Sequence, residues 1–256
     1  MKDIKTIGIL GGVGPEATAE LFKRIVRRTP AKNDQQHIPI IVINNPQIPD
    51  RTKAILGEGE SPISDLINTA KKLEANNVDY ILLPCNTAHY FIDDIQKEIK
   101  TPIINMVEET VSFITKNYPS VKKIGMISTT GTIKTKIYHN AFEKKGIKVI
   151  IPDEIIQESV VMNSIYGEQG IKAGDHEKPK EKIEQIGKLL AGKGAEIILA
   201  GCTEISLVLK QKNVPYVVID PLTILAETGI AKAINIELPL SINLEKMEKE
   251  TNMVRN

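Results

Sequence analysis

The sequence predicts an α/β fold made of two pseudo-symmetric domains, each a mostly parallel sheet flanked by helices. Three observations support this prediction. Short β-branched segments alternate with amphipathic helical segments, a pattern typical of parallel sheets. The sequence also resembles itself after a shift of 117 residues, and its length of 256 residues suits two domains of ordinary size.

Eight segments have the apolar, β-branched composition of buried strands. They are residues 6–10, 38–43, 80–83, 103–104, 124–128, 149–151, 197–200 and 216–219. Residues 17–27 follow Pro15, which suits a first helical turn, and residues 63–74 place their apolar side chains on one helical face. Residues 222–234 are expected to form a helix that closes the fold, while the polar residues 244–256 are expected to fray or to pack against a partner.

The internal repeat aligns strand ends that lie far apart in the chain. After the shift of 117 residues, segment 5–14 falls on segment 122–131, and the two cysteines of the chain, Cys85 and Cys202, superimpose. A third pair of strand ends matches after a shift of 115 residues. Because three separated segments share almost one register, we interpret the chain as two copies of one α/β unit.

The repeat also divides the chain. We expect an N-terminal domain at residues 1–118 that carries Cys85, and a second domain at residues 119–220 that carries Cys202. The boundary falls where a proline interrupts the helical pattern. The last segment, 221–256, is expected to return to the first domain.

Composition excludes several classes of function. The 33 Lys and Arg residues against 32 Asp and Glu leave a net charge of +1, which gives no bulk attraction to nucleic acid. No apolar run approaches the length of about 20 residues that crosses a bilayer, so no membrane partner is expected. Only two cysteines are present, without metal-binding spacing, which favours a reduced, cytoplasmic setting and a small polar ligand.

Both cysteines occupy positions typical of reactive thiols. Each follows a predicted buried strand and precedes residues that open helices. The carboxyl ends of parallel strands line the ligand crevice of α/β folds, so we expect an active site in the cleft between the domains, with one thiol on each wall. A helix N-terminus also favours thiolate, which predicts lowered thiol pKa values.

Two opposed thiols suit the inversion of a stereocentre, because one face of the carbon needs a base and the other an acid. Other uses of the cysteines fit less well. Zinc lacks a full set of ligands, since His89 is isolated, and a papain-like nucleophile leaves the second cysteine unexplained. Segment 11–14 lacks the full dinucleotide fingerprint, and its glycines more plausibly open backbone amides to a small carboxylate.

Three segments carry a family resemblance: residues 11–18, 84–89 and 201–205. Together they resemble the aspartate/glutamate racemase family, most closely its aspartate racemase branch. The resemblance implies racemisation of a small amino-acid substrate without cofactor or metal, in a two-domain α/β fold that forms a homodimer. It covers about residues 5–233.

By position, the resemblance assigns site residues. Cys85 and Cys202 match the catalytic pair. The residues that match the family's ligands of the substrate α-carboxylate are Asn86, Thr87 and Thr203. Both cysteines of the family pattern are present, which favours a reversible racemase.

Four further residues match more variable positions of the family. Thr129 and Thr130 match the loop that closes the second wall of the site. Arg51, in a loop after the second strand, matches the segment that grips the side-chain carboxylate, and Lys172 matches a cationic position of the second domain. Val13 departs from the family, which usually has Met there.

The residues and the resemblance together predict an isomerase that interconverts L- and D-aspartate, or glutamate, by proton transfer at Cα. Two alternatives stay open. One is a related isomerase or decarboxylase of the same superfamily, such as a maleate isomerase or a hydantoin racemase. The other is a binding protein for a dicarboxylate that catalyses nothing.

Overall fold

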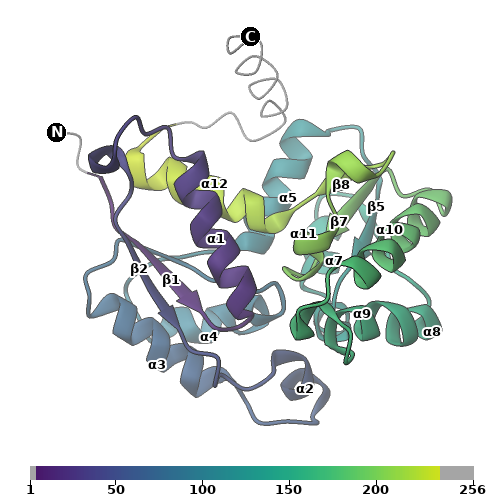
Figure 1. Ribbon diagram of the computed structural model, residues 1–256, viewed down its shortest axis with the longest axis horizontal. Helices are drawn as coiled ribbons and strands as arrows, with labels where there is room; N and C mark the ends of the chain where they lie inside the picture. The colour runs from purple at the N-terminus through teal and green to yellow at the C-terminus, as the bar shows by residue number, and fades with distance from the viewer. Residues whose placement is uncertain (1–3, 237–256) are drawn as a thin grey trace.

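The computed structural model describes residues 4–236. It contains two parallel four-stranded sheets flanked by helices, which confirms the predicted fold class (Figure 1). The first sheet consists of β1 (Ile7–Gly11), β2 (Ile40–Asn44), β3 (Tyr80–Leu82) and β4 (Ile103–Ile104). The second consists of β5 (Lys123–Ile127), β6 (Lys148–Ile150), β7 (Ile197–Ala200) and β8 (Val217–Ile219).

Helices connect the strands and cover the sheets. They are α1 (Pro15–Arg28), α2 (Arg51–Leu56), α3 (Ile63–Glu74), α4 (Ile92–Lys97), α5 (Met106–Asn117), α6 (Thr130–Thr135), α7 (Ile137–Glu143), α8 (Glu154–Ile156), α9 (Asn163–Tyr166), α10 (Glu177–Gly192), α11 (Ile205–Val208) and α12 (Pro221–Ile234). Short 3-10 turns are η1 (Asp34–Gln36), η2 (Thr87–Phe91), η4 (Ile171–Ala173) and η5 (Gln211–Asn213), and η3 (Gln157–Met162) is a π-helical turn. Within residues 4–236, no helix is both long and apolar enough to cross a membrane.

The two sheets repeat each other strand by strand. Their orders, β2-β1-β3-β4 and β6-β5-β7-β8, are the same. The register agrees with the sequence repeat as well, because the pair Ile7↔Tyr80 corresponds to the pair Ile124↔Ile197. The two cysteines therefore leave equivalent strands, β3 and β7, at equivalent ends.

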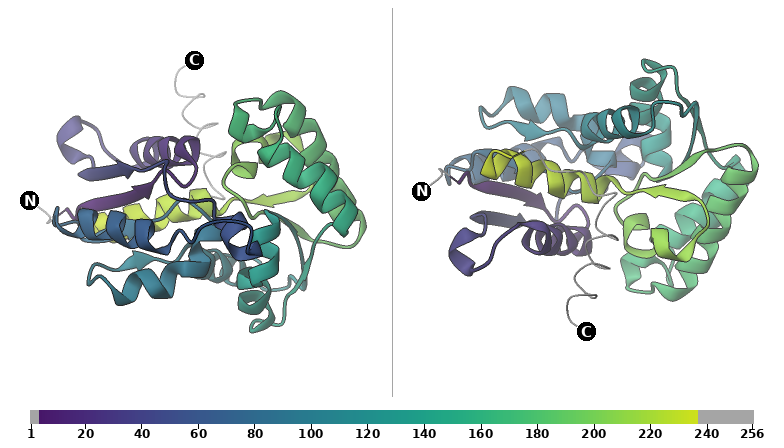
Figure 2. Two further views of the ribbon diagram at one scale, coloured as in Figure 1. Left: turned by 90° about the horizontal axis from the view of Figure 1, so that it is seen from below. Right: turned by 90° about the horizontal axis from the view of Figure 1, so that it is seen from above.

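Helix α12 packs against the first sheet, although it follows the last strand of the second. Its Leu222, Leu225 and Ile230 share one apolar core with β1, α1 and β3. Figure 2 shows this helix, in yellow, lying along the half of the molecule that holds β1 and β2. The chain thus crosses between the two sheets twice.

A partly buried network of ion pairs stabilises the second crossing. Arg24 of α1 contacts Asp220, and its Nε donates to Glu20 Oε1 at 2.9 Å. The Asp220 side chain also accepts from the backbone N–H of Leu222 and caps α12. Burial disfavours the charged form of Asp220, but the neighbouring Arg24 holds the pKa of its carboxyl below the usual range.

Some local expectations need correction. Several strands begin or end one or two residues away from the predicted bounds, since hydrogen bonds to neighbouring strands decide where a strand ends. Arg51 is not in a loop: it opens the helix α2, which Asp50 caps by accepting from Lys53 N. The predicted segment 244–256 lies outside the described residues.

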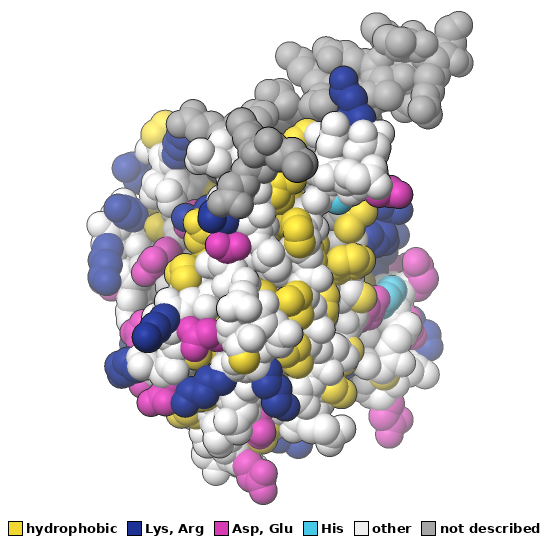
Figure 3. Space-filling view, turned by 90° about the vertical axis from the view of Figure 1, so that its left-hand side faces the viewer, with side chains coloured by type: hydrophobic (Ala, Val, Ile, Leu, Met, Phe, Trp, Pro, Cys, Tyr) yellow, Lys and Arg dark blue, Asp and Glu magenta, His cyan; other side chains and the backbone are white. Residues whose placement is uncertain are grey.

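The surface mixes charged and apolar side chains. Figure 3 shows one face, on which apolar side chains form a band between charged groups. Large apolar side chains that are exposed in the structure include Phe22 and Val26, one turn apart on α1. A face of this kind is a candidate contact surface for another chain.

The packing of α12 gives a stability prediction. Leu225→Ala removes a fully buried side chain between α12 and the first sheet, and we expect it to lower the free energy of unfolding by about 2–5 kcal/mol. Urea denaturation followed by circular dichroism measures the change. Ile155→Ala, at a side chain that is 80% exposed, is the control and should change stability by less than about 0.5 kcal/mol. Equal effects of the two substitutions would contradict the packing described above.

Candidate active site

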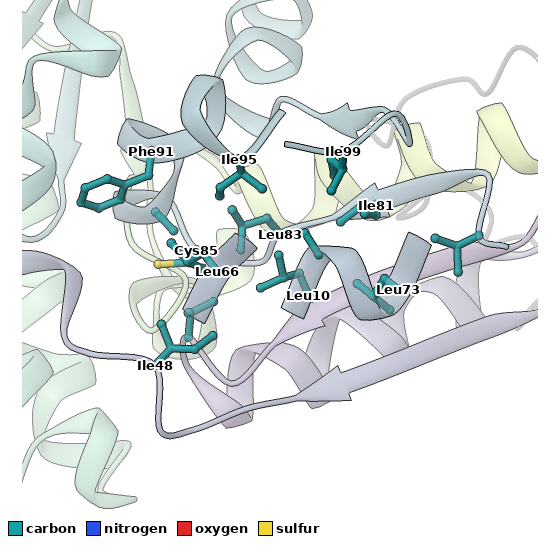
Figure 4. Packing of buried hydrophobic residues seen from close by; sticks show 14 residues of the cluster. Leu10, Ile48, Leu66, Leu73, Ile81, Leu83, Cys85, Phe91, Ile95 and Ile99 are labelled. Atoms are coloured by element: carbon teal, nitrogen blue, oxygen red, sulfur yellow. The ribbon is translucent and has the colours of Figure 1, made fainter. Parts of the chain in front are cut away.

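Cys85 lies in the turn between β3 and η2, at the edge of an apolar cluster of the first half. Figure 4 shows its sulfur pointing away from that cluster, toward the ribbon of the second half. Its backbone N–H donates to Leu83 O at 2.8 Å, which tightens the turn. The strand end thus presents a buried thiol to the space between the two sheets.

His89 fixes the backbone at Cys85. The N–H of Met106 donates to Nε2 at 3.0 Å, so Nδ1 carries the proton and donates to Cys85 O at 2.8 Å. Burial lowers the pKa of His89 to about 4, which keeps the ring neutral. Because both ring nitrogens have protein partners, His89 is not free to ligate zinc.

Cys202 lies in the equivalent turn between β7 and α11 and is a free, buried thiol. Its Sγ donates to Glu204 Oε2 at 2.9 Å. The other oxygen of this carboxylate, Oε1, accepts from Lys172 Nζ at 2.6 Å. On the second wall, the Glu204 carboxylate therefore lies between the Cys202 thiol and the Lys172 ammonium group and is hydrogen-bonded to both.

The expected lowering of the Cys202 pKa is wrong in this structure. Helix α11 spans only Ile205–Val208, so its dipole is short. Burial and the negative charge of Glu204 raise the pKa of the Cys202 thiol well above its usual range. The local effect of a helix N-terminus is outweighed by a side chain two residues away.

Arg51 is almost completely buried, at 7% exposure, and faces Cys85. Its Nη1 donates to the carbonyls of Ile48 and Pro49 at 3.2 and 2.9 Å. Burial opposes the charged form, but the charges of Cys85 and Asp50 outweigh it and raise the pKa of the guanidinium. Its Nε is buried and has no hydrogen-bond partner within residues 4–236, so one N–H remains for a ligand.

Asn86 also keeps a free donor. Tyr138, on α7 of the second half, donates its hydroxyl to Asn86 Oδ1 at 2.6 Å. This bond fixes the orientation of the side-chain amide, because only the oxygen can accept. Among the described residues, the buried amide nitrogen, Nδ2, has no hydrogen-bond partner. Arg51, which lies beside Cys85 in space, and Asn86, which follows it in the chain, thus each keep one donor without a partner in the described structure.

The predicted threonines join the two walls. The hydroxyls of Thr87 and Thr129 lie 2.9 Å apart, and Thr132 contacts each of them at 2.9 and 3.1 Å. Thr130 instead donates to Glu158 Oε1 of η3. Thr87 and Thr129 therefore hold the halves together in addition to lining the site.

Lys172 and Thr203 complete the second wall. The Lys172 ammonium is within electrostatic reach of both Cys202 and Cys85, and together with Glu204 they raise its pKa against the effect of burial. It also lies 5.4 Å from the centre of the Tyr166 ring. Thr203 is buried, and its hydroxyl donates to Glu204 Oε2 at 3.3 Å. Lys172 is thus paired with Glu204 instead of standing free for a substrate carboxylate.

The glycines after β1 serve close packing. The N–H of Gly12 donates to Thr18 Oγ1 at 3.1 Å, so this amide is not open to a carboxylate as expected. A Cβ at Gly12 would lie 2.2 Å from the backbone of Asn45, and one at Gly14 would lie 2.9 Å from Glu204 Oε1. Gly12 and Gly14 have φ of 91° and 124°, which also favours glycine.

Sequence reasoning missed three residues of this site: Glu204, Tyr138 and Tyr166. Glu204 could have been predicted from the sequence, because a carboxylate two residues after Cys202 lies close to that thiol in the chain. Tyr138 and Tyr166 carried none, because each reaches the site through packing between the halves. Tyr166 donates to Asp50 Oδ2 across that boundary at 3.0 Å.

Several known proteins with similar sequences or structures are named as racemases. The chain is 29% identical over 231 residues to the broad specificity amino-acid racemase RacX of Bacillus subtilis, covering 88% of this chain and 96% of that protein. The solved structure of Picrophilus torridus aspartate racemase is 32% identical, with a TM-score of 0.79, over 91% of this chain and 96% of that one. An aspartate racemase homologue from Pyrococcus horikoshii is 26% identical, with a TM-score of 0.71, over 90% and 99% of the two chains.

The family comparison covers most of the described structure. The sequence profile of Asp/Glu/Hydantoin racemase matches residues 10–229. This range includes Cys85, Cys202 and the strands from which both cysteines follow. With both walls of the candidate site inside the matched region, the chain belongs to the Asp/Glu/hydantoin racemase family.

Proposed function

We propose that this protein is a cofactor-independent racemase that interconverts L- and D-aspartate. The observation that carries the proposal is the placement of Cys85 and Cys202 at equivalent ends of two equivalent strands, with Lys172 near both. A pseudo-twofold arrangement of this kind supplies one proton-transfer group for each face of Cα.

The proposed chemistry moves two protons. The Cys85 thiolate removes the Cα proton from one face, while the Cys202 thiol gives its proton to the opposite face. For the reverse reaction, Cys202 acts as the base and Cys85 as the acid. Arg51 lies beside Cys85, and the hydrogen bond from Cys202 to Glu204 keeps the Cys202 thiol protonated.

The free donors support an acidic substrate. The unpartnered Nε of Arg51 suits the side-chain carboxylate, because a guanidinium forms strong charge-assisted hydrogen bonds with carboxylates. The unpartnered Nδ2 of Asn86 suits the α-carboxylate. The similarity to Picrophilus torridus aspartate racemase points the same way, and we propose that Thr87, Thr129, Thr130 and Thr203 line the remaining wall.

A broader substrate range is the second candidate, since RacX of Bacillus subtilis is a broad specificity racemase that aligns with 88% of this chain. A related isomerase, a decarboxylase or a dicarboxylate-binding protein are further alternatives. Racemisation in deuterated water labels Cα of the product enantiomer, an isomerase of alkenes labels no amino acid, and a binding protein turns nothing over. We also expect a homodimer in the cytoplasm, with the exposed apolar residues Phe22 and Val26 available to a second copy.

The thiol pair gives the first functional prediction. Cys85→Ala and Cys202→Ala should each reduce racemisation of aspartate at least about 10²-fold, because each removes a group that transfers a proton in the transition state. Deuterium incorporation at Cα, followed by NMR for both enantiomers, measures the loss. Thermal melting of each variant confirms that the fold is kept. Near wild-type interconversion by either variant would contradict the two-base mechanism.

The second functional prediction concerns substrate choice. Arg51→Leu should lower kcat/KM for aspartate about tenfold or more, because it removes a charge-assisted hydrogen bond worth about 1.5–3 kcal/mol. It should lower kcat/KM for alanine far less. The measurement is kcat/KM for both substrates. Arg27→Leu, which removes an exposed arginine of α1, is the matched control. Equal losses on aspartate and alanine would show that Arg51 acts on the fold or on Cys85 instead.

The third functional prediction concerns the pH dependence of racemisation. The raised pKa of Cys202 means that this thiol keeps its proton as the pH rises through 9.0, its ordinary value. We therefore expect kcat/KM to fall on the alkaline side only above that value, and to fall on the acidic side when the thiolate base is protonated. A pH profile of aspartate racemisation tests this. An alkaline fall centred below 9 would contradict the assignment of Cys202 as the acid.

A further inference from the structure

Glu204 is the most enclosed carboxylate of the site. Its Oε2 accepts from Cys202 Sγ at 2.9 Å and from Thr203 Oγ1 at 3.3 Å, while its Oε1 accepts from Lys172 Nζ at 2.6 Å. The residue is 6% exposed. Both oxygens therefore have hydrogen-bond partners within the chain.

The first half of the chain closes over this carboxylate. A Cβ at Gly14 would stand 2.9 Å from Glu204 Oε1, so the glycine turn after β1 lies directly against it. Burial raises the pKa of the Glu204 carboxyl, but the charge of Lys172 and the hydrogen bond from Cys202 outweigh burial and hold that pKa below its usual range. The geometry is that of an ionised carboxylate accepting from a neutral thiol.

We infer that Glu204 is a positioning residue that holds Cys202 as a protonated thiol in the resting enzyme, and that Lys172 keeps Glu204 ionised. The inference rests on the proposed function for the role of Cys202 as an acid. A thiolate at Cys202 would stand beside a carboxylate 2.9 Å away, and two negative charges at that distance repel strongly in a buried site. The two cysteines, equivalent by fold, therefore differ in their charged neighbours: a carboxylate lies beside Cys202 and a guanidinium beside Cys85.

The groups that face Cys202 account for this difference. Glu204 favours the thiol, and Lys172, one group further away, partly offsets it. Tyr166 lies within electrostatic reach as a neutral phenol, since burial raises its pKa. On the opposite wall, Cys85 faces the guanidinium of Arg51 instead of a carboxylate.

The asymmetry has a consequence for turnover. In the resting form, Cys85 is the base and Cys202 the acid, so this form accepts the enantiomer whose Cα proton faces Cys85. After one turnover Cys202 is a thiolate and Cys85 a thiol. Transfer of a proton from Cys85 to Cys202, directly or through water, restores the resting form, and Glu204 drives this transfer toward Cys202.

The test uses Glu204→Gln and needs no substrate. Glutamine keeps the shape and an acceptor oxygen but removes the charge. Iodoacetamide labelling of the whole chain over a range of pH, resolved by peptide mass spectrometry, gives a separate titration midpoint for each cysteine. We expect the Cys202 midpoint to fall by about 1–3 pH units in this variant, the usual effect of a close like charge, with a smaller change at Cys85.

Glu196→Gln is the matched control, because Glu196 precedes β7 at its other end and accepts hydrogen bonds only from backbone N–H groups of Lys122 and Lys123 among its described partners. It should leave both midpoints unchanged. If Glu204→Gln fails to fold in a melting experiment, Glu204→Asp retains a charge for Lys172 but draws the carboxylate away from Cys202, and its Cys202 midpoint should also fall.

A Cys202 midpoint that is unchanged or raised in a folded Glu204 variant would overturn the inference. Labelling separates this failure from failure of the proposed function. If the Cys202 midpoint falls as expected, the role of Glu204 is supported even where wild-type protein fails to racemise aspartate. If racemisation depends on both cysteines but the midpoint does not move, the function is kept and the role of Glu204 is rejected.

Discussion

A charge removed from water needs a partner, and this constraint governs how the two halves of the chain meet. Arg24 and Asp220 pair where the chain returns from the second sheet to the first. Lys172 and Glu204 pair on the second wall of the site, and Arg51 faces Cys85 on the first. Arg24, Arg51 and Glu204 are buried, and each of them has an oppositely charged or ionisable partner beside it.

The fold was predictable because its signals are local or repetitive. β-branched segments mark all eight strands, and the shift of 117 residues anticipates the register, since Ile9↔Leu82 corresponds to Met126↔Leu199. Helix α2 was missed although Asp50 and Gly57 have the residue types of its two caps. A helix of six residues has too short an apolar pattern to stand out, and its position depends on contacts with α6 across the halves.

The site was predictable only in part. Repeat and resemblance identified both cysteines and the donors Arg51 and Asn86, because strand ends and motif positions are visible in the sequence. The protonation of the Cys202 thiol was not predictable, since it depends on which side chains fill the space beside this thiol. Burial and the charge of Glu204 together raise the pKa of Cys202, against the effect expected of a helix N-terminus. Tyr138 orients Asn86 from helix α7 of the second half, and no sequence pattern links residues 52 positions apart.

The path of the chain limits how the site can open. Because α12 returns to the first sheet, the second sheet is attached to the first at two points, near residues 118 and 220. A body held at two separate points turns only about the line that joins them. A rotation of one sheet against the other about this line would have to break the Thr87–Thr129 and Tyr166–Asp50 hydrogen bonds across the halves.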